Sequence, residues 1–212
     1  MLLGEAKVIT GHNSGLGKPS KMPGFSTSLS ASDCKVGSKL REVKGSVCEK
    51  CYAMRGNYTF PGTKQAHKNR LAALNHPQWV EAMTLLIGHY TNKDDPYFRI
   101  HDSGDFQSVE HVRLWVQVAR NLPHVMFWAP TREAGIVKSA MKEVGCWPSN
   151  LIIRLSAAMI GKAPPDSFLG FLTSTVSADM GYKCPASKQD NSCGDCRACW
   201  NPNVQNVDYK KH

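Results

Sequence analysis

Long apolar runs are absent from this chain of 212 residues. No stretch approaches the roughly 18–20 consecutive apolar residues that a membrane-spanning helix needs. Residues 1–13 also lack the apolar core of a secretory signal. We therefore expect no membrane partner and a cytoplasmic location, where thiols stay reduced and disulfides are rare.

Common catalytic and nucleotide-binding signatures are absent as well. The chain has no G-x-G-x-x-G dinucleotide fingerprint and no Ser-His-Asp signature of a hydrolase. Residues 11–19, GHNSGLGKP, are only superficially similar to a phosphate-binding loop, because the spacing differs and Pro19 follows the lysine. No internal repeat or low-complexity tract stands out, which argues against a repeat architecture.

The composition is that of a folded domain with a basic surface. Hydrophobic residues make up 42% of the chain, and its length fits a single domain over residues 1–212. Residues 1–24 are rich in Gly, Lys and Pro and are expected to be irregular, whereas residues 184–212 form a cysteine-rich C-terminal segment. The net charge of +9 favours an anionic partner, either nucleic acid or a small anionic substrate.

Short apolar segments alternate with amphipathic ones along the chain. The expected strands are 25–30, 97–102, 125–129, 151–155 and 171–176. The expected helices are 65–74, 77–90, 109–120 and a segment that Thr131 begins and Gly145 ends. This alternation indicates parallel strands joined by helices. About five strands predict an α/β fold, a small or incomplete TIM-like (β/α) barrel, with an open doubly wound parallel sheet as the alternative.

Seven of the eight cysteines lie in two clusters, and their spacing indicates a metal centre. The clusters are Cys34, Cys48 and Cys51, and Cys184, Cys193, Cys196 and Cys199. The C-x2-C-x2-C run in the second cluster is typical of iron–sulfur ligands, and Cys184 completes a four-thiolate [4Fe–4S] site. The first cluster has three thiolates, which would leave one iron open for a substrate or cofactor, or would hold a three-iron cluster. Cys146 stands alone and is expected to be a buried apolar residue.

Zinc is the alternative metal. The two C-x2-C hooks would combine in one site, as zinc proteins often arrange them. That arrangement leaves Cys34, Cys184 and Cys199 without a role. Basic side chains near the first cluster, such as Lys35 and Lys39, would offset the negative charge of a thiolate-ligated cluster.

Polar side chains collect where the expected strands end, which is where α/β proteins form their sites. The candidate catalytic or substrate-binding residues are His101, Asp102, Asp105, Arg132 and Arg154. The candidate cofactor-binding residues are Ser156, Ser174 and Thr175. A guanidinium group binds a phosphate or carboxylate through two parallel hydrogen bonds, so either Arg132 or Arg154 could bind an anionic substrate. The competing interpretation is structural, with loop-capping carboxylates and surface arginines.

Several segments together resemble the bacteriophage family called gene product 88. They are PGFSTSLSASDC (23–34), CEKCYAMRGNY (48–58), FRIHDSGDFQS (98–108), FWAPTRE (127–133) and CGDCRACW (193–200), followed by Val207, Tyr209 and His212. The resemblance covers most of the chain from about residue 20 onward. It implies a bacteriophage protein in the cytoplasm of the infected host cell, and the family carries little established biochemistry.

A second resemblance is to radical S-adenosylmethionine enzymes. These combine an incomplete α/β barrel with a three-cysteine loop after the first strand, and they leave one iron open for the cofactor. This chain departs from their C-x3-C-x2-C loop, because 13 residues separate Cys34 from Cys48 and Lys50 replaces the usual aromatic residue. The resemblance implies S-adenosylmethionine as a cofactor and an auxiliary role for the C-terminal cluster.

We therefore expect an iron–sulfur redox protein or a radical-S-adenosylmethionine-like enzyme that takes electrons from a cellular donor, with flavin open as a further cofactor. The alternative is a zinc-stabilised nucleic-acid-binding protein, which the +9 charge and Tyr52, Tyr58 and Trp200 near the cysteines favour. A structural metal protein without turnover is the third hypothesis.

Overall fold

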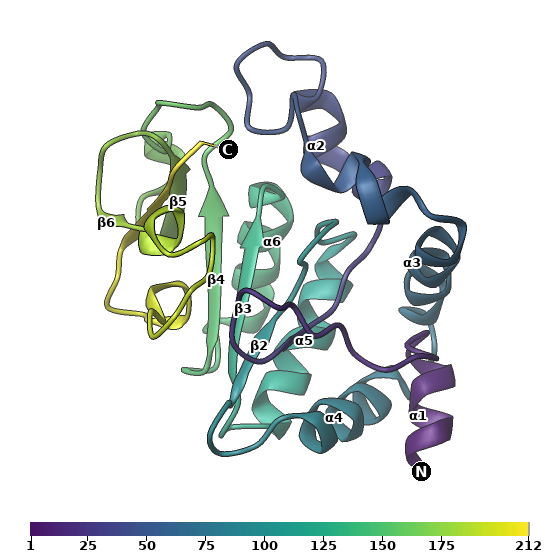
Figure 1. Cartoon of the computed structure of the whole chain (residues 1–212). Coiled ribbons are helices and arrows are strands. Elements are labelled where there is room, and N and C mark those ends of the chain that lie inside the picture. Colours follow the sequence, from purple (N-terminus) through teal and green to yellow (C-terminus); the bar gives the residue numbers. More distant parts are fainter. Residues whose placement is uncertain (212) are drawn as a thin grey trace.

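The structure, a computed structural model, describes residues 1–211 as one all-parallel sheet with helices packed against it (Figure 1). The strands are β1 (Phe25–Ser26), β2 (Tyr97–Arg99), β3 (Met126–Thr131), β4 (Leu151–Ser156), β5 (Leu172–Val176), β6 (Tyr182–Lys183) and β7 (Asn206–Tyr209). The helices are α1 (Leu3–Ile9), α2 (Lys35–Leu40), α3 (Pro61–Ala73), α4 (Trp79–Tyr90), α5 (Val109–Asn121) and α6 (Ala134–Val144). Because every neighbouring pair of strands is parallel, all carboxyl ends meet at one edge.

The sheet is open within the described residues. Its order is β1-β2-β3-β4-β5-β7-β6, and the two edge strands β1 and β6 are not paired with each other. The TIM-like barrel is therefore not confirmed, and the open parallel sheet fits instead. From β1 to β5 the order follows the chain, whereas a doubly wound sheet reverses its order near the middle. The sheet is thus wound in one direction, but its last two strands exchange places and it does not close.

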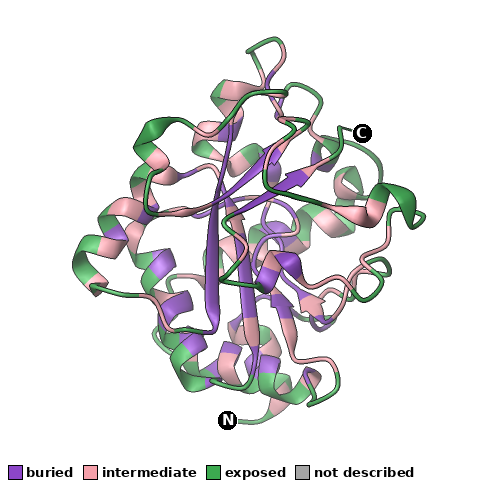
Figure 2. Ribbon diagram, turned by 90° about the vertical axis from the view of Figure 1, so that its left-hand side faces the viewer, coloured by how far each residue is buried: buried purple, intermediate pink, exposed green. Residues whose placement is uncertain are grey.

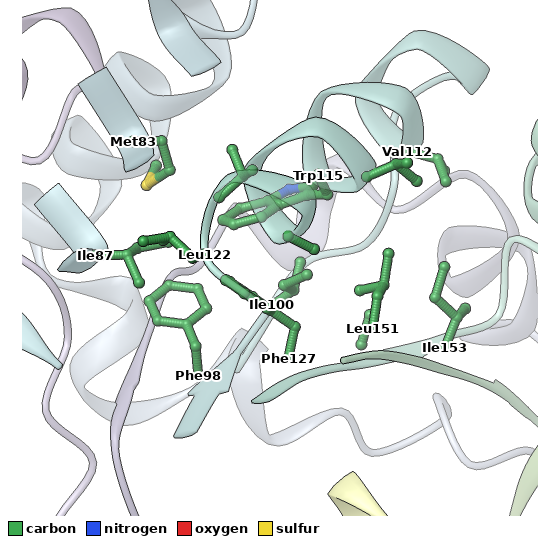
Figure 3. Packing of buried hydrophobic residues seen from close by; sticks show 14 of the residues in the cluster. Met83, Ile87, Phe98, Ile100, Val112, Trp115, Leu122, Phe127, Leu151 and Ile153 are labelled. Atoms are coloured by element: carbon green, nitrogen blue, oxygen red, sulfur yellow. The ribbon is translucent and has the colours of Figure 1, made fainter. Parts of the chain in front are cut away.

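Helices α4, α5 and α6 pack against one face of this sheet. Val112, Trp115 and Val116 recur with helical spacing on α5, so that they form one apolar side. They meet alternate strand residues such as Phe98 and Phe127 in a continuous core (Figure 3). None of the helices in residues 1–211 is long and apolar enough to cross a membrane.

The C-terminal segment covers the opposite face of the sheet. Arg99, Trp128 and Arg154 alternate with the core-facing residues and therefore project from this second face. Trp200 packs on Trp128 with ring centroids 5.1 Å apart, and its indole N–H donates to the Phe98 carbonyl at 3.1 Å. The sheet consequently lies in the middle of the molecule, with buried strands between partly exposed layers (Figure 2).

The N-terminal segment 1–24 differs from the sequence-based expectation, because α1 occupies Leu3–Ile9. The Glu5 carboxylate accepts the Leu2 amide hydrogen at 2.6 Å, and Ala6 is buried where α1 packs against α4. The glycines, lysines and prolines of this segment gave no helical pattern in the sequence. Helix α1 is stable because it packs against α4, which lies far along the chain.

Other bounds also differ from the expected ones. The strand expected at 25–30 is assigned only at Phe25–Ser26, although Thr27 and Leu29 continue its backbone hydrogen bonds to residues of the β2 region. Residues 34–51 contain the short helix α2, which was not among the expected helices. The helix expected from residue 77 begins at Trp79, and α3 begins at Pro61, where proline suits the first helical position.

Candidate metal centres

Cys34, Cys48 and Cys51, which we call the first cysteine group, lie beyond the carboxyl edge of the sheet next to α2 (Figure 1). All three are free thiols. A Cβ atom added at Gly37 would lie 3.6 Å from the Cys48 Sγ and 3.7 Å from the Cys34 Sγ. Both sulfurs therefore face one small space, which the missing side chain of Gly37 leaves free.

Burial favours the protonated thiols of Cys34 and Cys48 when no metal is bound. Burial, with smaller contributions from Asp105, Cys48 and Cys51, raises the pKa of Cys34 to about 12. Burial also raises the pKa of Cys48, whereas the Arg132 guanidinium lowers it. Because metals bind thiolates, metal binding here would release protons.

Asp105 and Glu133 hold the loops around the first group. The Asp105 carboxylate accepts hydrogen bonds from the Thr131 hydroxyl, from the Arg132 amide at 2.8 Å and from the Phe106 amide at 2.8 Å. It thus joins the end of β2 to the end of β3. Glu133 accepts the amide hydrogen of Val36 in α2 at 2.8 Å. The predicted catalytic role of Asp105 stays a prediction, because its contacts are those of a positioning residue.

Cys184, Cys193, Cys196 and Cys199 form the second cysteine group. They lie in the C-terminal segment beside β5 and β6, and Cys184 directly follows β6 (Figure 1). The Tyr209 hydroxyl lies 3.1 Å from the Cys199 Sγ, and the Tyr182 hydroxyl lies 3.4 Å from the Cys196 Sγ. Tyrosine hydroxyls therefore contact two of the four sulfurs.

The pKa values of Cys184, Cys193 and Cys199 are each raised in part by another thiol of the second group. The pKa of Cys199 is raised to about 12, mainly by burial, with Cys184 and Cys193 acting in the same direction and the Tyr209 hydrogen bond opposing them. Burial raises the pKa of Cys193 as well, followed by Cys184 and Cys196. The thiols that affect these pKa values all belong to the second group, and none belongs to the first. The two groups are therefore separate.

Arg154 fixes the second group to the sheet. It is fully buried in β4, and its Nε donates to the Cys199 carbonyl at 3.0 Å. Its terminal nitrogens donate to the carbonyls of Ala198, Asn201, Thr173 and Val204. Because these bonds occupy all five N–H groups, none is left for a substrate. The predicted substrate contact of Arg154 stays a prediction, and its observed contacts position the Cys199 segment.

No three or more histidine, cysteine or acidic side chains in residues 1–211 are arranged to hold a single metal ion. A tetrahedral zinc site has sulfur–metal distances of about 2.3 Å and draws its thiolates close together. An iron–sulfur cluster has irons at separate corners and spreads its ligands more widely. The two kinds of centre therefore differ in how closely their thiolates must converge.

His101 and Asp102 end β2 but face different surroundings. His101 has a φ of 66° and is 2% exposed, and its ring packs between Phe106 and His111 without a hydrogen-bond partner in the described residues. Asp102 lies nearer the first group, because its backbone carbonyl accepts the hydroxyl hydrogen of Tyr52. The Asp102 Oδ2 accepts from the Ser26 hydroxyl at 3.2 Å, and its buried Oδ1 has no partner there.

The candidate cofactor-binding residues bond to one another and to β7. The hydroxyls of Ser156 and Ser174 lie 3.0 Å apart, and the Thr175 hydroxyl donates to Asp208 at 2.7 Å. These bonds link neighbouring strands, and the predicted cofactor contacts remain predictions.

Sequence reasoning missed Arg99, which lies between the two groups. Its guanidinium lies 4.8 Å from the centre of the Trp128 ring, and its charge lowers the pKa of Cys193. Burial raises the pKa of Tyr58, and the charge of Arg99 acts in the opposite direction. The sequence signal for Arg99 was its position as an arginine that alternates with apolar residues along a predicted strand.

Cys146 is exposed, which corrects the expectation that it is buried. It follows Gly145, which ends α6 with a φ of 82°, so the chain turns toward solvent there. Cys146 thus lies apart from both groups and serves as a control in the experiments below.

The family model described as gene product 88 matches residues 2–202. The match begins nearer the N-terminus than the resemblance in the sequence suggests, and Val207 and Tyr209 lie beyond it. His212 lies outside the described residues. No curated protein and no solved structure was found to match the chain. Because the model spans nearly the whole sequence, the chain belongs to the gene product 88 family.

Proposed function

We propose that this protein is an iron–sulfur redox protein with two clusters. The second cysteine group would hold a [4Fe–4S] cluster with four thiolates, and the first group would hold a cluster with three. When bound, such clusters supply one-electron redox chemistry. A cellular reductant in the host cytoplasm would be the electron donor.

The observation that carries this proposal is the division of seven cysteines into two separate groups, each with a nearby arginine whose Nε atom is buried. The Nε atoms of Arg132 and Arg197 are buried without a partner in the described residues. Arg132 acts on the pKa of Cys48 and Arg197 on that of Cys193, so one arginine lies near each group. A thiolate-ligated cluster is negatively charged and accepts N–H···S hydrogen bonds, which fits such unpaired donors.

The difference between three and four thiolates assigns different roles to the two groups. Four thiolates saturate a [4Fe–4S] cluster, which suits electron storage and transfer. Three leave one iron free for a substrate or for a cofactor such as S-adenosylmethionine, with flavin as a further candidate electron partner. Strands β1 to β5 are parallel neighbours, and the first group follows β1 at their carboxyl edge, where α/β enzymes bind substrates.

The experiment that tests this proposal is anaerobic purification followed by absorption spectroscopy and analysis of iron, sulfide and zinc. We expect broad absorption near roughly 400 nm that bleaches with dithionite, and equal amounts of iron and sulfide. A colourless protein with stoichiometric zinc and no sulfide would reject the proposal.

Single cysteine variants assign the clusters. Cys196→Ala and Cys48→Ala should each lower the iron content, by about half if each group holds its own cluster. Cys146→Ala is the matched control, because this thiol is exposed and remote from both groups. If Cys48→Ala and Cys196→Ala each removed all iron, a single shared cluster would replace the two-cluster proposal.

A second candidate is a zinc-stabilised nucleic-acid-binding protein. Residues 34–68 contain eight Lys and Arg but only two Glu, and Tyr52 and Phe60 in this segment are exposed. Basic side chains with exposed aromatic rings bind single-stranded nucleic acid by charge and stacking. This candidate predicts salt-sensitive binding of an oligonucleotide that Tyr52→Ala and Phe60→Ala weaken, in a protein that contains zinc rather than sulfide.

A further inference from the structure

Arg99 is a half-buried cation with unused hydrogen-bonding capacity. It projects from β2 on the face that the C-terminal segment covers, and its Nε donates to the His101 carbonyl at 3.2 Å. One terminal nitrogen lies 3.9 Å from the Met22 sulfur, and the other has no hydrogen-bond partner among residues 1–211. A guanidinium presents five N–H donors, so most of this fork is free.

Asp102 lies near Arg99 but forms no ion pair with it. The four salt bridges of the described residues involve neither side chain. Each nevertheless affects the pKa of the other, so the two groups lie close together. The Asp102 Oδ1 is buried and has no partner. Because the two half-buried charges remain apart, an acceptor and several donors stay unsatisfied, which is costly unless another group lies between them.

Trp128 adds a third unsatisfied group at the same place. It pairs with Arg99 in the register of β2 and β3, and its ring lies under the guanidinium. Trp128 is 6% exposed, yet its indole N–H has no partner in the described residues. A buried indole N–H normally finds an acceptor, so this one is directed at a group that the chain does not provide.

The charges of this region favour an anion. Arg70 and Arg99 both act on Asp102, which gives two positive charges against one negative charge. A carboxylate accepts two parallel N–H bonds from a guanidinium, which matches the free fork of Arg99. The Asp102 Oδ1 accepts one hydrogen bond and requires a donor on the same molecule.

We propose that Arg99, Trp128 and Asp102 bind a small carboxylic acid that carries a hydrogen-bond donor beside its carboxylate, an α-hydroxy or α-amino acid. Arg99 and the Trp128 N–H bind the carboxylate, and Asp102 accepts from the neighbouring hydroxyl or amino group. The site lies between the two cysteine groups, because Arg99 acts on Cys193 on one side and Tyr52 bonds to Asp102 on the other. This site gives the proposed function a substrate class. The chemistry performed on the bound acid rests on the proposed function, whereas the binding of the acid does not.

Calorimetric titration of the full chain, purified without oxygen, tests this site with three probes. Glycolate carries a hydroxyl beside its carboxylate, glycine carries an amino group, and acetate carries neither. We expect glycolate or glycine to bind about tenfold more tightly than acetate, because only they have a donor for Asp102. The tighter of the two identifies the class. Equal binding of all three probes, or no binding by any, overturns the proposal and leaves water between the side chains.

Trp128→Phe removes the unpaired N–H but keeps the aromatic surface under Arg99. It should weaken binding of the preferred probe by about fivefold, and Arg99→Gln should weaken it more than tenfold. Trp147→Phe is the matched control, because this half-buried tryptophan packs against the core on the helix side. If Trp128→Phe left the affinity unchanged while the chain stayed folded, the assigned site would be wrong.

Iron analysis of the same samples separates this proposal from the proposed function. If the protein contains no cluster but binds glycolate with the expected variant effects, the site stands and the redox function fails. If iron is present and none of the probes binds, the function stands and the site fails. If Arg99→Gln lowers the iron content without changing probe affinity, Arg99 is a counterion of the second group and the proposed site is overturned.

Discussion

The two cysteine groups are held in different ways. The second group lies on a segment whose carbonyls bond to one buried cation, Arg154, in the middle of the sheet. The first group lies on loops that two carboxylates, Asp105 and Glu133, hold through backbone amides. A single strand residue therefore fixes the second group, whereas the first depends on the mutual position of several loops. We therefore expect changes in pH and exposure to air to affect the first group more than the second.

Lowering the pH should produce the largest difference in stability between the regions of the two groups, because buried histidines occur only on the side of the first group. Burial lowers the pKa of His12 from 6.5 to about 3, and that of His111 likewise to about 3. A folded pKa below the unfolded value contributes stability that is present above pH 6.5 and lost as the pH falls toward 3. Residues 125–211 contain no histidine.

We therefore predict that the metal-free protein loses about 3–4 kcal/mol per buried histidine over this range, and that hydrogen exchange rises first in the N-terminal half. Mass spectrometry of exchanged peptides between pH 7 and 4 measures this order. His12→Gln should flatten the pH dependence, whereas His124→Gln, at an exposed position, should not. Simultaneous loss of protection in both halves would contradict the prediction.

Replacing Arg154 should destabilise the second group selectively. Arg154→Met leaves five buried or partly buried carbonyls without their donor and should lower the free energy of unfolding by about 3–4 kcal/mol. Limited proteolysis should then cleave near Cys199 while the first group stays protected. Denaturant unfolding measures the energy, with Arg113→Met on the exposed side of α5 as the control. A loss below about 1 kcal/mol would show that the segment is held elsewhere.

Air should remove iron faster from the group with three thiolates. An open iron is accessible to oxygen and water, so we predict release from the first group about tenfold faster than from the second. Alkylation followed by mass spectrometry identifies which cysteines become free. Equal labelling of Cys48 and Cys196 over time would remove the distinction between an open and a saturated cluster.

Gly37→Ala should give the smallest effect and test the first group alone. The added Cβ would lie 3.0 Å from the Cys34 Cβ and would occupy the space between two sulfurs. Helix propensity favours alanine, so the metal-free protein should change in stability by less than about 1 kcal/mol. Iron retention by the first group should fall a few-fold, and that of the second should not change. Gly135→Ala in α6, where the added atom meets nothing, is the control.

The sequence predicted those parts of the fold whose pattern is local. Val112 and Trp115 have helical spacing, and the apolar run before Thr131 has strand length, because each element turns one face to the core. Closure of the sheet was not predictable, since it depends on whether β1 and β6 approach each other across the whole chain. Helix α1 was missed for the same reason, because α4 stabilises it.

The candidate site was predictable only as a set of residue types. Cysteine spacing separated two groups, which the structure keeps apart. It could not show that Arg154 uses all its donors on the backbone, nor that Arg99 keeps most of its donors free, because both are arginines in apolar strands. Only their neighbours distinguish a positioning residue from a ligand-binding one.

The anchoring of the two groups also sets an order of assembly during synthesis. The acidic and basic neighbours of the first group have all been synthesised once Glu133 has been added to the chain. The second group needs β4 for its anchor and Tyr209, which comes later in the chain than all four of its cysteines, for a sulfur contact. If the first group holds the proposed metal centre, a nascent chain could therefore complete that centre before the second group has been synthesised.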